Sequence, residues 1–148
     1  MRRATFNGIF TALFIVWAVA AHSLLFAGAT EQGDAALIGS VRLTQSVMAD
    51  GRPLPAGTYQ VRLTADQPVP TAGESPGAER WIEFVRSGTV AGREVATVVS
   101  ADDIDQIAKG PRPKANTSRV DVLKGGDYVR IWINRGGTHY IIHMPPAR

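Results

Sequence analysis

The sequence contains no cysteine among its 148 residues. Disulfide bonds, thiolate catalysis and cysteine-bound zinc are therefore excluded as sources of stability or chemistry. The motifs G-x-S-x-G and H-E-x-x-H and a phosphate-binding glycine loop are also missing. Because none of the residue patterns that carry common hydrolytic or phosphoryl chemistry is present, we expect a protein that is not an enzyme.

Excess charge is scarce after the first few residues. The chain has 16 lysines and arginines and 13 aspartates and glutamates. Two of the arginines are Arg2 and Arg3, so the rest of the chain is nearly neutral. Phosphate binding needs a clustered basic face, and we therefore expect no nucleic acid as a partner.

Charge is also absent from residues 4–30, which are mostly apolar. A helix rises about 1.5 Å per residue, so Ile9 to Ala29 is long enough to cross a bilayer core of about 30 Å. Arg2 and Arg3 stand before this run. Positive charge stays on the cytoplasmic side, which predicts a cytoplasmic N-terminus and an outer C-terminal domain at a bacterial inner membrane.

A secretory signal peptide is the alternative for the same stretch. Ala27-Gly28-Ala29 has the small-residue form of a cleavage site, and removal would leave a free exported domain beginning at Thr30. The apolar run is longer than a usual signal core of about 7–15 residues, which favours an anchor. The expected organisation is an anchor or signal over 1–29, a linker over 30–35 and a periplasmic β domain over 36–148.

His22 is the unusual residue of the apolar stretch, because a polar ring at membrane depth needs a partner. Ala18 precedes it by four residues. This A-x-x-x-H pattern resembles the single membrane helices of bacterial light-harvesting polypeptides. The resemblance implies His22 as a ligand of bacteriochlorophyll magnesium and an accessory subunit of a photosynthetic reaction-centre and light-harvesting complex. The alternatives are a histidine in the last part of a signal peptide, or one near the membrane interface that bonds a neighbour. Ala18, Ala21 and Trp17 are further candidates for contact with other membrane-protein subunits.

The remaining sequence has the two-residue alternation of β-strands. In Thr58 to Thr64, Tyr59, Val61 and Leu63 fall on one face and polar residues on the other. Leu54-Pro-Ala-Gly-Thr-Tyr59 resembles the strand entry of exported bacterial β-sandwich modules. We predict an all-β antiparallel sandwich or partly open barrel, with one short helix near 101–109 and strands within 36–48, 58–64, 80–86, 93–100, 118–123, 127–134 and 138–144.

The strand over 127–134 carries the candidate surface for partner binding. Its alternation places Val129, Ile131 and Ile133 toward the core, and places Tyr128, Arg130 and Trp132 on the opposite face. Aromatic residues and arginine are enriched at protein interfaces. Two interpretations of Trp132 remain open: an exposed interface residue, or ordinary core beneath a second layer.

Two clusters of possible metal ligands are weak candidates. His139 and His143 are four residues apart on an expected strand, so they stand about 13 Å apart, too far for one metal ion. The aspartates at 102, 103 and 105 lack the glycine and distal glutamate of a calcium loop. We expect no metal site, and the sequence favours a non-catalytic domain that docks on a membrane assembly and stabilises it.

Overall fold

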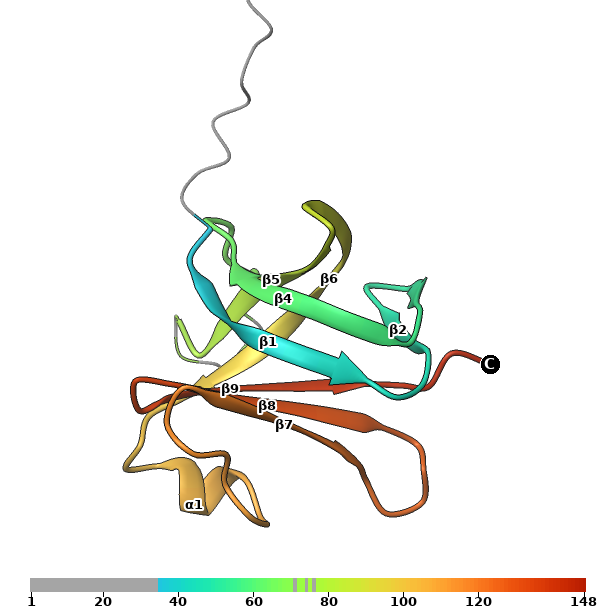
Figure 1. Ribbon diagram of the computed structural model, residues 1–148. Coiled ribbons are helices and arrows are strands. Elements are labelled where there is room, and N and C mark those ends of the chain that lie inside the picture. Colours follow the sequence, from blue (N-terminus) through green and yellow to red (C-terminus); the bar gives the residue numbers. More distant parts are fainter. Residues whose placement is uncertain (1–34, 71, 74, 76) are drawn as a thin grey trace, which may run out of the picture. The chain divides into compact units, whose positions relative to one another are not determined.

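The computed structural model describes residues 35–70, 72–73, 75 and 77–148 (Figure 1). The expected anchor over 1–29 and linker residues 30–34 lie outside the described residues. Within the described part of the chain, no helix is long and apolar enough to cross a membrane.

Seven strands form one antiparallel sheet that curls into a nearly closed barrel (Figure 1). The expectation of an all-β antiparallel domain is therefore confirmed. Every neighbouring pair of strands in the sheet is antiparallel. In spatial order the strands are β1 (Leu37–Leu43), β4 (Gly57–Leu63), β5 (Glu79–Arg86), β6 (Thr89–Val99), β9 (Thr138–Met144), β8 (Val129–Arg135) and β7 (Thr117–Val122).

A small second sheet is made by β2 (Val47–Ala49) and β3 (Arg52–Leu54). Asp50 and Gly51 join them with φ values of 45° and 72°. Positive φ at both central residues belongs to the type I′ turn that suits tight hairpins, and Asp-Gly is a preferred pair for it. The strand material expected over 36–48 is divided between two strands, because the chain leaves the main sheet after Leu43 and begins a new hairpin at Val47.

The segment after β9 is bound to this hairpin. The Met48 amide donates to the Pro145 carbonyl at 2.8 Å, and the Ala147 amide donates to the Ser46 carbonyl at 3.0 Å. Val47 also forms an isolated antiparallel bridge with Pro146. Residues 145–147 therefore form backbone hydrogen bonds along the edge of β2 that does not face β3.

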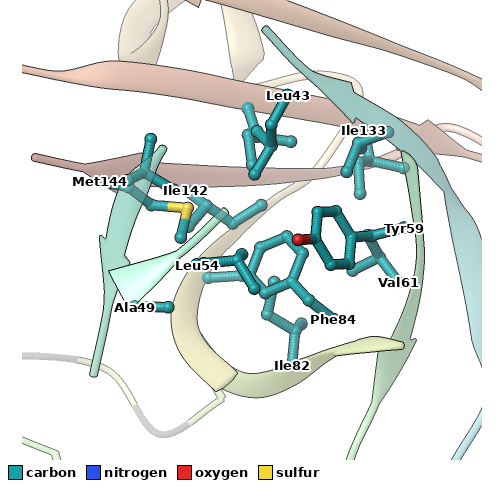
Figure 2. Packing of buried hydrophobic residues seen from close by; sticks show 14 of the residues in the cluster. Leu43, Ala49, Leu54, Tyr59, Val61, Ile82, Phe84, Ile133, Ile142 and Met144 are labelled. Carbon is teal, nitrogen blue, oxygen red and sulfur yellow. The ribbon is translucent and has the colours of Figure 1, made fainter. Parts of the chain in front are cut away.

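The interior of the barrel is apolar and closely packed (Figure 2). Tyr59 and Phe84 meet edge to face, with ring centroids 6.1 Å apart, and the Tyr59 hydroxyl donates to the Pro55 carbonyl at 2.7 Å. That bond satisfies the buried phenol without a second polar side chain. The strand alternation read from the sequence is confirmed here, since Tyr59, Val61, Val129, Ile131 and Ile133 are all buried.

A second apolar cluster lies on the outer face of β8 and β9. The helix α1 (Ile104–Ile107) and the residues after it cover that face, which is also where the short helix was expected. Before the helix, the Asp103 amide donates to Ser100 Oγ at 3.2 Å, and Ser100 Oγ donates to the Asp103 carboxylate at 2.7 Å. The cluster consists of Val99, Ile104, Ala108, Trp132 and Ile141.

The barrel stays open between β1 and β7, the two ends of the strand order. Among the residues that the structure describes, no backbone hydrogen bond joins β1 to β7. The Ser118 hydroxyl donates to the Ser40 carbonyl at 2.5 Å across the opening. Close to this point a Cβ on Gly39 would lie 3.0 Å from Ile133 Cγ2, so glycine permits β1 to pass close to β8.

Candidate functional site

The outer face of β8 is divided into a covered end and an open end. Arg130 and Trp132 share this face, because the residues between and beside them point into the barrel, and Tyr128, the residue just before β8, continues the alternation. Tyr128 is 48% exposed, whereas Trp132 is 0% exposed. The expected stripe therefore exists as a face of the strand, but only its Tyr128 end reaches the surface.

Trp132 belongs to the core beneath α1. Its indole Nε1 donates to His139 Nδ1 at 3.0 Å, and the two rings meet edge to face with centroids 5.8 Å apart. A surface role for Trp132 is not compatible with this enclosure, so the second of its two interpretations holds. The alternation indicated which face Trp132 occupies, while a covering segment from another part of the chain determines its burial.

His139 is buried beside Trp132 and serves as an acceptor. Burial lowers the pKa of His139, and the charge of Arg112 lowers it further, while the Asp105 carboxylate opposes the shift. Arg112 and Asp105 themselves form an ion pair. A neutral ring with its proton on Nε2 fits the donated indole hydrogen, which gives His139 a structural role here.

Arg130 is held in place at the boundary between the covered and open ends. Its guanidinium lies 5.1 Å from the Trp132 ring centroid, donates to the Lys109 carbonyl at 2.9 Å and donates to Asp121 at 3.1 Å. Only 11% of the Arg130 side chain is exposed. Arg130 is therefore a fixed cation rather than a free surface arm.

Asp121 connects Arg130 with Arg119, which precedes it by two residues on β7. Arg119 Nε donates to both carboxylate oxygens of Asp121, at 2.7 and 2.9 Å. The bond from Arg119 lowers the pKa of Asp121, as does the one from Arg130, while burial opposes them. Two arginines share one carboxylate, so this part of the face carries a net positive charge.

A small cavity of about 110 Å³ lies beside Arg130. Ile107 of α1, which is 60% exposed, lines it together with His143 of β9. His143 is exposed, and burial of part of the ring together with the Arg130 charge lowers its pKa. Apolar, aromatic and cationic groups thus meet around one recess, an arrangement that can receive an inserted side chain.

No protein-family model, curated protein or solved structure matches the chain. Function is therefore inferred from this surface and from the amino-acid sequence.

The other predicted site residues cannot be placed beside this face. Trp17, Ala18, Ala21 and His22 lie outside the described residues. His139 and His143 both lie on β9, the first buried and the second exposed. The residues described by the structure include no group of three histidine, aspartate or glutamate side chains that could hold a metal ion.

Sequence reasoning missed Asp121 and Ile107 as members of the surface. Asp121 carried a usable signal, because Arg119 and Asp121 stand on one face of an alternating strand next to Arg130 on the neighbouring strand. Ile107 had none, since only the docking of α1 brings it beside the cavity.

Proposed function

We propose that this protein is a non-catalytic docking subunit, anchored in a bacterial inner membrane by residues 1–29, whose outer β domain binds and stabilises a larger membrane-protein assembly. The observation that carries the proposal is the open end of the outer face of β8. There a half-exposed tyrosine, Tyr128, precedes by two residues an arginine that its own domain already holds in place.

The chemistry of this end suits a protein partner. Tyrosine and arginine are the residue types that dominate binding energy at interfaces, in particular when neighbouring contacts exclude water. Three contacts fix the Arg130 guanidinium before any partner arrives, so binding loses little of its side-chain entropy. The recess lined by Ile107 and His143 offers an apolar position next to that cation.

The proposal has a more specific form, which rests on the resemblance of the first stretch to light-harvesting helices. In that form His22 binds bacteriochlorophyll, and the assembly is a photosynthetic reaction-centre and light-harvesting complex. Ala18 and Ala21 then permit close approach of a neighbouring helix, because small residues drive packing within lipid. A cleaved, freely exported module that binds a ligand or an envelope partner is the competing function, favoured by Ala27-Gly28-Ala29.

Native purification of the tagged full-length chain tests the docking role. We expect Tyr128→Ala to weaken recovery of the co-purifying subunits by about 30-fold in affinity, which corresponds to about 2 kcal/mol. Val69→Ala, at an exposed loop position, is the control and should leave recovery unchanged. Equal recovery with Tyr128→Ala would remove this face as the docking site.

Membrane extraction and intact mass test the anchor separately. We expect the full-length chain to remain in the membrane fraction after carbonate treatment. A soluble product beginning at Thr30 would leave the exported module as the function. Within the anchored case, His22→Ala should remove pigment from the purified complex, and a colourless complex before substitution would end the photosynthetic form of the proposal.

A further inference from the structure

β7 ends the main sheet, and among the described residues no strand is hydrogen-bonded to its outer backbone edge, although β1 passes close to it. The Leu123 amide donates to the Tyr128 carbonyl at 2.9 Å, which extends the ladder between β7 and β8. The backbone groups of an antiparallel pair alternate in direction, so the backbone amides and carbonyls of Arg119 and Asp121 point toward β8, as those of Leu123 do. The amides and carbonyls of Ser118, Val120 and Val122 therefore point away from β8.

The space along this edge is open. A groove of about 440 Å³ runs between β7 and β1, lined by Val120 and Val122 on one side and by Arg42 on the other. Val122 is 55% exposed. The Ser118 side chain bonds the Ser40 carbonyl, so β1 lies close to this end of β7, but among the described residues no backbone hydrogen bond joins β1 to β7.

β7 also lacks the usual protection of an edge strand. Proteins blunt exposed edges with proline, with charged residues such as lysine, or with a β-bulge. The strand Thr117–Val122 has neither proline nor lysine, its register with β8 is continuous, and its two charged residues form an ion pair with each other. An unprotected edge beside an open groove indicates a surface that pairs with another strand.

The sequence of β7 is complementary to itself when one copy runs antiparallel to another about Val120. In that register Arg119 of each copy lies opposite Asp121 of the second copy, and Ser118 lies opposite Val122. Opposite charges facing each other across antiparallel strands are stabilising. Arg119 uses only its Nε toward its own Asp121, which leaves the two terminal nitrogens of its guanidinium available to the second copy.

We propose that β7 pairs with β7 of a second copy of this chain, antiparallel and centred on Val120, in a two-fold-symmetric dimer. Ser118, Val120 and Val122 supply the backbone hydrogen bonds, and Arg119 and Asp121 supply the cross-strand ion pairs. The paired strands continue one sheet from each barrel into the next. Such an interface is self-complementary, as two-fold contacts require, and it is separate from the Tyr128 end of β8.

Cysteine substitution in the full-length chain tests the register directly, because the protein has no cysteine of its own. Directly opposite residues have Cα atoms about 5.5 Å apart, within disulfide reach. We expect Val120→Cys alone to give disulfide-linked dimers under mild oxidation in native membranes. Ser118→Cys and Val122→Cys should each fail alone and succeed when the two variants are co-expressed, since like positions are offset by about 13 Å.

A charge reversal tests the ion pairs in the same assay. Arg119→Glu places two carboxylates opposite each other at both ends of the interface, and we expect the dimer yield of the Val120→Cys chain to fall at least about tenfold. Arg135→Glu, at an exposed position of β8, makes the same charge change away from β7 and should have no effect.

Three outcomes would overturn self-pairing. Val120→Cys could give no dimer in a folded chain, or Ser118→Cys and Val122→Cys could cross-link alone through random collision. The Val120 position could also cross-link to a different protein, which would assign the edge to a foreign strand. None of these outcomes alters the result expected for Tyr128→Ala, so the dimer and the docking function fail independently.

Discussion

At the scale of single residues, Trp132 and His139 depend on each other. The indole is a donor only, and in the buried cluster His139 Nδ1 accepts its hydrogen. A polar group enclosed without a partner costs about 1–3 kcal/mol. The pair therefore lets a large aromatic ring fill the space beneath α1 without leaving a buried donor unsatisfied.

Replacing Trp132 by alanine should destabilise the domain by about 3–5 kcal/mol, because a fully buried ring leaves a cavity. Tyr128→Ala, on the same face and half exposed, should change stability by no more than about 0.5 kcal/mol. Urea unfolding of the two variants, compared at equal m-value, measures both effects. Similar losses for both residues would contradict the division of this face into covered and open ends.

Stability should fall as the pH drops through the range in which His139 becomes charged. The folded-state pKa of His139 lies below its unfolded value, because burial and Arg112 disfavour the charged ring. The unfolded chain then binds more protons, so stability is complete above pH 6.5 and declines as the pH falls toward the folded pKa. Thermal melts between pH 8 and pH 5 measure the slope.

Two substitutions separate the histidines in that experiment. His139→Asn keeps an acceptor near the Nδ1 position and cannot be protonated, so it should flatten much of the slope. His143→Gln removes the other histidine with a lowered pKa, so it measures how much His143 contributes to the pH dependence of stability. A slope unchanged by His139→Asn would assign the pH dependence to groups elsewhere.

At the scale of elements, the sequence predicted the strands and their core faces better than it predicted which segments pack against those strands. Alternation identified Val129, Ile131 and Ile133 as core, because period two depends only on which face is buried. It did not determine whether the opposite face of β8 meets water or a second layer. Burial of Trp132 arises from Ile104 and Ala108, about 25 residues earlier in the chain, and no local pattern encodes that contact.

The close approach of β1 and β8 gives a prediction for an element. Gly39→Ala should destabilise the domain by about 1–3 kcal/mol, because the added methyl lies 3.0 Å from Ile133 Cγ2 and one strand must shift. Ser40→Ala, on the next and solvent-facing residue, is the matched control. Equal melting temperatures for Gly39→Ala and the unsubstituted chain would show that the crossing is loosely packed.

At the scale of the whole molecule, strand order was beyond the reach of the sequence. Hairpins follow from tight turns, such as Ser87-Gly88 between β5 and β6 with φ values of 51° and 78°. The pairing of β6 with β9 spans the intervening α1, β7 and β8. It depends on which apolar faces fit one another in three dimensions, and the sequence pattern gave no preference among the alternatives.

Deleting residues 145–148 should lower stability by about 1–3 kcal/mol. The deletion removes the backbone partners of Met48 and Ser46 and uncovers Val47, which is completely buried. Deleting Arg148 alone is the control, since the contacts lie at Pro145, Pro146 and Ala147. Denaturant melts that coincide for the two truncations would show that the segment contributes nothing.

The bond between β2 and residues 145–147 has a consequence for the timing of folding. Ribosomes make Val47 nearly a hundred residues before Pro146, yet the two must pair to complete the hairpin sheet. A nascent chain that has reached only Met144 can form local hairpins, but β2 still lacks its second partner. The finished domain therefore forms only after β9 and the following segment have left the ribosome, so its folding is completed at the end of synthesis.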